Sequence, residues 1–219
     1  MSELGLRERK KQRTRQLVAE TAHRLFLARG FDAVTVAEVA READVAEKTV
    51  FNYFPTKEDL FYSRLESFEA ELLDAIRGRK PGETVVAAFG RFVLQERGLL
   101  AHKRGSEARA AVEALRAITR TITASPALLA REQQVFARYT NSLAAVIAQE
   151  TGAAADDVEP WVVANALIGI HRALIDFVRR RVLAGGFTPS RLAREVRAQG
   201  EQALARLERG LGRYASKRR

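Results

Sequence analysis

The sequence predicts an all-α protein in which a small N-terminal domain of three helices precedes a larger helical domain, with about nine helices in all. Two observations predict this fold class. Apolar residues recur at helical spacing along most of the chain, and no segment alternates convincingly with the period of two that a half-buried strand requires. The five prolines each fall just before a helical run or within its first turn, where the missing amide costs little.

Composition excludes several classes of protein. None of the 219 residues is cysteine, so the chain has no disulfide, no thiolate zinc site and no cysteine nucleophile. Residues 1–16 are charged and hold no apolar stretch of signal-peptide length, and no run approaches about 18 consecutive apolar residues. We therefore expect a soluble cytoplasmic protein with no membrane partner. The formal net charge of +10 favours a polyanionic partner without establishing one.

The helices follow in chain order from the apolar spacing and from the positions of proline and glycine. We expect helices near residues 4–29, 36–43, 47–53, 57–77, 83–102, 106–123, 126–150, 157–183 and 189–213. Gly30, Gly152 and Gly185 stand where helices should end, because glycine adopts the backbone conformation that closes a helix. We expect a first domain over residues 1–57 and a second over residues 58–219.

The segment from Thr35 to Leu60 holds two helices that are too short to be stable alone, since helix nucleation is costly. Thr35 with Glu38, and Thr56 with Asp59, have the spacing of a capping box at a helix start. Apolar residues at helical spacing in this segment predict one small core shared by the helices near 4–29, 36–43 and 47–53. These are Val36, Val39, Ala40, Ala43, Val45, Val50 and Phe54.

The outer face of the helix near 47–53 carries Lys48, Thr49, Phe51 and Asn52. These side chains can donate, accept and make apolar contact, which is what the reading of base edges in a DNA groove requires. Two short helices around a tight turn, the second with such a face, form a helix-turn-helix. The basic run from Arg7 to Arg15 could lie along the DNA backbone or in a minor groove.

Residues 15–61 resemble the DNA-binding domain of the TetR family of bacterial transcriptional regulators. The resemblance rests on LVAETAHRLFLARGFDAVTV, AEVAREADV and KTVFNYFPTKEDLF. It implies phosphate contacts from Thr35, Tyr53 and Lys57. It also implies that the outer-face residues Lys48, Thr49, Phe51 and Asn52 face bases or the groove wall.

Plainer roles remain open for three of these residues. For Thr35 the alternative is a role as a helix cap alone, for Phe51 a partial place in the core, and for Lys57 a solvated side chain with no DNA contact. One position departs from the family pattern: members often have serine where Ala46 stands. Alanine can neither cap the recognition helix nor touch a phosphate, so we expect no contact there.

The larger half of the chain holds no catalytic constellation. The three histidines lie far apart in sequence, and no metal-ligand spacing, nucleophile elbow or phosphate-binding glycine loop is present. We therefore predict no catalytic residue, no metal site, no cofactor and no enzymatic activity.

The segment WVVANALIGIHRALIDFVRRRVL is apolar almost all round up to Val178, which predicts burial on every side. The resemblance implies a homodimer through the helices near 157–183 and 189–213, packed as a four-helix bundle. Small residues such as Gly169 and Ala173 would permit close approach. The alternative is a purely intramolecular core. Arg172 and Asp176, four residues apart, are expected to pair.

The resemblance also implies an effector pocket among the middle helices. Candidate lining residues are Phe92, Phe136, Tyr139 and Trp161, with Asn165 and His171 as polar anchors. The alternative is that these residues belong to the ordinary core. The helix expected at 57–77 would join the two domains and carry motion between them.

The predicted function is sequence-specific transcriptional regulation. The protein would be a repressor that a small hydrophobic or amphipathic ligand releases from a palindromic operator in double-stranded DNA. Two alternatives remain open. The same fold could act without a ligand, or as an activator. A protein of another class would bind nucleic acid through charge alone or serve as a scaffold.

Overall fold

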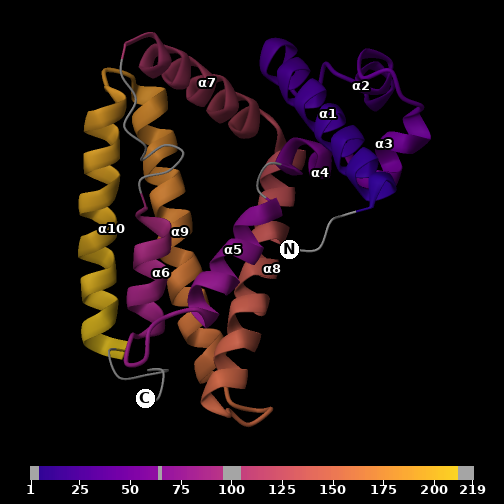
Figure 1. Ribbon diagram of the computed structural model, residues 1–219. Helices are drawn as coiled ribbons and strands as arrows, with labels where there is room; N and C mark the ends of the chain where they lie inside the picture. Colours follow the sequence, from indigo (N-terminus) through magenta and orange to yellow (C-terminus); the bar gives the residue numbers. More distant parts are fainter. Residues whose placement is uncertain (1–4, 64–65, 96–104, 212–219) are drawn as a thin grey trace. The chain divides into compact units, whose positions relative to one another are not determined.

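The computed structural model describes residues 5–63, 66–95 and 105–211, and all the regular secondary structure in these ranges is helical (Figure 1). The all-α prediction is confirmed. The ten helices of the described chain are α1 Leu6–Arg29, α2 Val36–Glu42, α3 Glu47–Tyr53, α4 Lys57–Tyr62, α5 Glu66–Arg77, α6 Val85–Val93, α7 Gly105–Ala124, α8 Pro126–Thr151, α9 Glu159–Ala184 and α10 Pro189–Leu211.

Two expected helices are shorter in the structure. The helix expected at 57–77 is divided into α4 and α5, with residues 64–65 outside the described part. The helix expected at 83–102 ends at Val93, and residues 96–104 are likewise outside. Apolar periodicity identifies the buried face of a helix, but it does not tell whether the backbone hydrogen bonds continue from one turn to the next.

The chain divides into two compact units. The first comprises residues 1–67 together with residues 120–131, and the second comprises residues 68–119 and 132–219. The first unit therefore extends past residue 57 through α4, and it includes the end of α7 and the start of α8.

Aromatic rings form the centre of the first unit. Phe26 of α1 lies 5.2 Å from Phe31 and 5.8 Å from Phe61, measured between ring centroids. Phe61 also meets Tyr62 edge-on at 5.1 Å. Such tilted and edge-to-face pairs are favourable beyond the area that they bury. They explain how helices of six or seven residues are held in place.

The start of α8 is attached to α4 within this unit. The Tyr62 hydroxyl donates a hydrogen bond of 3.1 Å to the Leu128 carbonyl, and Arg131 forms an ion pair with Asp59. Both partners of each contact belong to the first unit.

Helices α6, α9 and α10 pack together in the second unit, where α10 lies along α9 and contacts α6 (Figure 1). Two glycines allow the close approach of α6 and α10. A Cβ atom at Gly90 would lie 2.8 Å from Cδ1 of Leu204, and one at Gly200 would lie 2.7 Å from Cδ2 of Leu94. Substitution at either glycine would force these leucines to move.

Helix α9 is long and apolar enough to cross a membrane by length and composition, a criterion that core helices of soluble proteins also meet. Its residues Leu167, Ile168 and Leu174 are buried in the core of the second unit.

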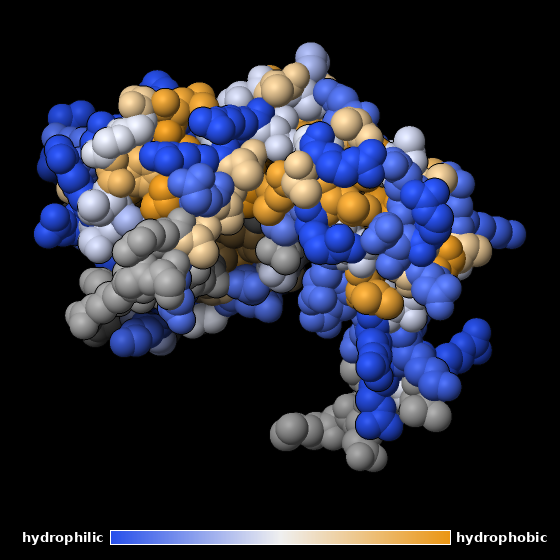
Figure 2. Space-filling view, turned by 90° about the horizontal axis from the view of Figure 1, so that it is seen from above, coloured by the Kyte–Doolittle hydropathy of each residue, from blue (hydrophilic) through white to orange (hydrophobic). Residues whose placement is uncertain are grey.

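Hydrophilic side chains cover much of the face shown in Figure 2, and groups of hydrophobic side chains lie between them.

Candidate nucleic-acid interface

The capping box predicted at the start of α2 is present. The Glu38 amide donates to Thr35 Oγ1 at 3.1 Å, and the Thr35 amide donates to Glu38 Oε2 at 2.8 Å. Arg29 lies 2.9 Å from the same carboxylate. The hydrogen bonds from Thr35 and Arg29 lower the pKa of Glu38 to about 2. Thr35 therefore has a structural role as a cap, whatever else it contacts.

The turn between α2 and α3 depends on Asp44, which has φ = 52°. Aspartate tolerates this left-handed conformation better than most residues do. The next amide, of Val45, donates to the Ala40 carbonyl at 3.0 Å and so closes the turn. The geometry brings the two short helices together as a helix-turn-helix.

Helix α3 has a buried side and an outer side. Val50 and the following Phe54 are each 1% exposed, as the sequence predicts, whereas Phe51 is 43% exposed. Lys48 and Asn52 are also exposed. Somewhat less than half of Phe51 is thus available for contact with a partner, and Lys48 and Asn52 lie on the side away from the core.

The start of α3 has no side-chain cap. Ala46 occupies the N-cap position in an extended conformation, and no side-chain hydrogen bond is made there. By contrast, Thr56 Oγ1 accepts from the Asp59 amide at 3.0 Å at the start of α4. The expectation that Ala46 leaves the recognition helix uncapped is confirmed.

Lys57 is more enclosed than a solvated lysine. Its ammonium lies 4.1 Å from the centroid of the Phe31 ring and 5.9 Å from that of Phe26. Burial lowers the pKa of Lys57 from its ordinary value. The side chain therefore stabilises the aromatic core by a cation–π contact, a role that the sequence did not suggest.

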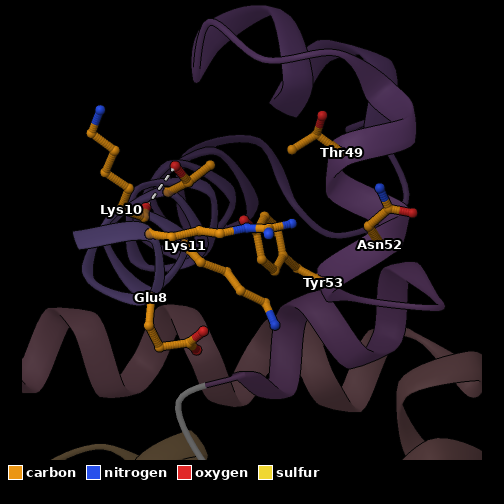
Figure 3. Close-up of a pocket in the computed structure, with 8 residues that line it drawn as sticks. Glu8, Lys10, Lys11, Thr49, Asn52 and Tyr53 are labelled. Carbon is orange, nitrogen blue, oxygen red and sulfur yellow. Dashed lines mark hydrogen bonds between the residues drawn. The ribbon is translucent and has the colours of Figure 1, made fainter. Parts of the chain in front are cut away.

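A groove lies between the N-terminal turns of α1 and the outer side of α3 (Figure 3). Its volume is about 690 Å³. The lining residues are Arg7, Glu8, Lys10, Lys11 and Thr14 from α1, and Thr49, Asn52 and Tyr53 from α3.

This groove brings together three of the residues predicted to contact DNA, Thr49, Asn52 and Tyr53. Its lining does not include the other four, Thr35, Lys48, Phe51 and Lys57. The sequence prediction covered the basic run from Arg7 to Arg15 as a whole and did not say which of its cations share one side of α1. The available signal was their spacing, since positions 7, 10, 11 and 14 fall on one side of a helix.

The residues expected in an effector pocket separate into two groups, both in the second unit. Phe68 lies 5.3 Å from Phe92, 5.3 Å from Tyr139 and 4.7 Å from His171, measured between ring centroids. Phe136 meets the His171 ring edge-on at 6.1 Å. These rings form one aromatic cluster, in which Phe68 is a member that the sequence analysis did not assign to a pocket.

Trp161 and Asn165 lie apart from this cluster, on the exposed side of α9. Trp161 is 54% exposed, and its indole Nε1 donates to Asn141 Oδ1 at 3.4 Å. The Asn165 side-chain amide donates to the Trp161 carbonyl at 2.9 Å.

The polar members of the aromatic cluster are uncharged near neutral pH. Desolvation lowers the pKa of His171 to about 4, because burial disfavours the imidazolium ion. Burial likewise raises the pKa of Tyr139 to about 12. The two polar members are therefore neutral, although the Arg138 guanidinium borders the cluster, 5.7 Å from the centroid of the Tyr139 ring.

The prediction of an ion pair between Arg172 and Asp176 is wrong. The Arg172 guanidinium donates to Gln133 and lies 5.3 Å from the Phe136 ring centroid. Asp176 instead lies 3.7 Å from Arg179. Partners on a neighbouring helix compete with the i,i+4 position, and the sequence alone does not reveal them.

The two short helices, the turn at Asp44 and the outward polar side of α3 define a helix-turn-helix DNA-binding protein. Residues 18–63 match the family model described as bacterial regulatory proteins, tetR family, and residues 97–182 match the model described as the MftR C-terminal domain. The chain belongs to the TetR family of DNA-binding transcriptional regulators. The family is one of transcriptional regulators, which are generally not enzymes.

Two relatives are similar over most of the chain. The HTH-type transcriptional regulator TcmR of Streptomyces glaucescens is 32% identical over 155 residues, which cover 70% of this chain and 67% of TcmR. The putative mycofactocin biosynthesis transcriptional regulator MftR of Mycobacterium tuberculosis is 27% identical, over 74% of this chain and 78% of MftR. The nucleoid occlusion factor SlmA of Haemophilus influenzae is 34% identical, over only 34% of each chain.

Solved structures share the fold at low sequence identity. GusR of Salmonella enterica superposes with a TM-score of 0.53 and 17% identity, covering 91% of this chain and 95% of GusR. NalD of Pseudomonas aeruginosa, the secondary repressor of the MexAB-OprM multidrug efflux pump, gives 0.55 and 17%, covering 89% of this chain and 96% of NalD. At these identities the similarity shows the fold alone.

Proposed function

We propose that this protein is a cytoplasmic, homodimeric repressor that binds a palindromic operator and leaves it when a small hydrophobic or amphipathic ligand binds. The observation that carries the proposal is the outer side of α3. Lys48 and Asn52 read base edges there, and the exposed Phe51 contacts the groove wall or a thymine methyl group. Tyr53 and Lys57 contact phosphates, which position the helix without reading sequence.

The proposed dimer rests on α9. Its buried residues serve the protein's own core, yet Val162 and Trp161 on the other side are each 54% exposed. The small residues Gly169 and Ala173 follow on that exposed side. Exposed apolar side chains next to small residues suit a symmetric helix-to-helix contact, since such an interface buries the same surface on both subunits.

The dimer is tested by substitution on the exposed side of α9. Ala173→Glu is expected to give a monomer in sedimentation and to weaken operator binding, because it buries an unpaired charge at the interface. Ile168 is unsuitable for this test, since it is 1% exposed and lies within the protein's own core. Trp161 is the only tryptophan, so its emission should shift to longer wavelength when dilution separates the subunits. Sedimentation of the wild type as a monomer at micromolar concentration would contradict the proposal.

The proposed ligand class follows from the aromatic cluster around Phe68. A ligand that enters among these rings would meet aromatic faces and the neutral His171 and Tyr139, which favour apolar or aromatic groups with few polar atoms. Full switching between bound and released states needs roughly 5.5 kcal/mol of preference for the non-binding state. A screen of hydrophobic acids, acyl thioesters and aromatic compounds for release of the operator tests this part of the proposal. Release by none of the compounds would favour the alternative that the protein acts without a ligand.

The DNA-binding part is tested by footprinting on DNA that flanks the protein's own gene. We expect a short protected palindrome, with two half-sites about one helical turn or a multiple apart, as a two-fold dimer requires. Protection that spreads evenly and shows no preferred site would instead favour binding through charge alone.

A further inference from the structure

The first two turns of α1 carry three cations on one side. Arg7, Lys10 and Lys11 occupy positions i, i+3 and i+4, and Thr14 follows at i+7. All four line the groove beside α3 (Figure 3), and the three cations are exposed. The remaining cations of these turns, such as Arg9 and Arg13, are absent from the lining. One side of the helix therefore concentrates positive charge next to the recognition helix.

The positions of these cations destabilise the start of α1. Like charges four residues apart repel each other, and positive charge near a helix N-terminus opposes the macrodipole. The N-cap, Gly5, has no side chain to offset this, and Glu8 is the acidic residue of the first turn that offsets it in part. Within the described ranges no carboxylate pairs with Arg7, Lys10 or Lys11, and the groove holds only one acidic residue. An anion in the groove would relieve the repulsion.

The opposite wall supplies hydrogen-bond donors of neutral groups. Thr49 and Tyr53 offer hydroxyls, and Asn52 lines the same wall. The groove volume of about 690 Å³ is far larger than the roughly 30 Å³ that one water molecule occupies. Its size and its mixture of cations and neutral donors suit a chain of phosphates better than a single ion.

The helical conformation of this segment decides how it can approach DNA. Residues from Leu6 onward belong to α1, so the basic run is a helix about 10–12 Å wide with its side chains. The minor groove of B-DNA is only about 6 Å wide, and it would not admit this helix. Of the two placements open from the sequence, the structure favours the DNA backbone.

We propose that the groove between α1 and α3 holds one phosphodiester strand of the operator, with Arg7, Lys10 and Lys11 as phosphate contacts. The inference rests on the proposed function, because the strand is that of the DNA whose bases α3 reads. The three cations add affinity that does not depend on base sequence. They also fix the register of α3, since the same strand borders the bases that Asn52 reaches.

The experiment compares two double variants of the full-length protein. The first, Arg7→Gln with Lys11→Gln, removes two groove cations four residues apart. The matched control, Arg9→Gln with Arg13→Gln, removes two cations at the same spacing from the same turns, but outside the groove lining. Binding to the operator and to a duplex of unrelated sequence is measured from about 50 to 200 mM salt. Circular dichroism compares the helix content of the two variants.

In a plot of the logarithm of the association constant against the logarithm of the salt concentration, the slope of the groove variant should be shallower by about 0.9 for each lost contact, hence by roughly 1.8 per protomer. The same counterion effect weakens binding by about fivefold per contact near 0.15 M salt, on both duplexes. The control should keep nearly the full slope. If the groove variant is poorly helical, Lys10→Gln alone should still lose about 0.9 relative to Arg9→Gln.

Equal slopes for the groove variant and its control would overturn the inference, because the cations would then act only through net charge. A larger loss in the control would overturn it as well. The proposed function is judged separately, by whether the wild type protects a discrete operator. The slope comparison holds on any duplex, since phosphates carry no sequence information.

Discussion

The missing cap at Ala46 predicts that Ala46→Ser stabilises the protein. Ala46 has φ = −69° and ψ = 145°, the extended conformation in which a serine Oγ can accept from the amide three residues later. That amide, of Thr49, already donates to the Ala46 carbonyl at 2.8 Å, so it is not wholly unsatisfied. We therefore expect a gain at the lower end of the usual capping range, about 0.5–1 kcal/mol.

Thr35→Ala is the matched variant with the opposite sign. It removes the hydroxyl that accepts from the Glu38 amide at 3.1 Å and should lower the free energy of unfolding by about 1 kcal/mol. Both variants are compared with the wild type by urea unfolding at one protein concentration, because the stability of a dimer depends on concentration. If Thr35→Ala destabilises the protein and Ala46→Ser leaves it unchanged or weaker, the capping argument for α3 is refuted.

Three further predictions concern titration and the aromatic core. The pKa of Glu38 is about 2 in the folded protein and 4.5 ordinarily, so its ionised carboxylate stabilises the fold fully above pH 4.5, and this stabilisation is lost as the pH falls toward 2. Glu38→Gln should therefore make the free energy of unfolding less dependent on pH over this range. The pKa of His171 is about 4 in the folded protein and 6.5 ordinarily, so below pH 6.5 the unfolded chain takes up a proton that the folded protein does not. The free energy of unfolding should therefore decline as the pH falls from 6.5 toward 4, and His171→Phe should remove this decline. Lys57→Ala should lower the free energy of unfolding by about 0.5–1 kcal/mol even without DNA, because its contact with Phe31 is lost; equal stability in urea would contradict this.

Local signals in the sequence were sufficient for the helix-turn-helix. The spacing of Thr35 and Glu38 gave the capping box, and the alternation of buried Val50 and Phe54 with exposed Phe51 gave the orientation of α3. These features depend on residues within one or two helical turns, where spacing along the chain determines spacing in space.

Features that join distant parts of the chain were not predicted. Nothing near Tyr62 in sequence indicates that its hydroxyl meets the Leu128 carbonyl, and nothing near Arg172 indicates Gln133 as its partner. The effector candidates follow from the family resemblance, which places apolar lining residues and polar anchors on the middle helices without indicating which of them meet. Only the tertiary arrangement separates Phe92 and His171, in the cluster around Phe68, from the exposed Trp161.

The central claim is that the outer side of α3 reads bases while Tyr53 positions the helix on the backbone. The most direct test is the affinity of Asn52→Ala and Tyr53→Phe for an operator and for a panel of its single-base-pair variants. Asn52→Ala should lose about 1–3 kcal/mol of discrimination at one position in each half-site, whereas Tyr53→Phe should weaken binding to every duplex alike. A uniform loss from Asn52→Ala, with discrimination intact at every position, would contradict the account.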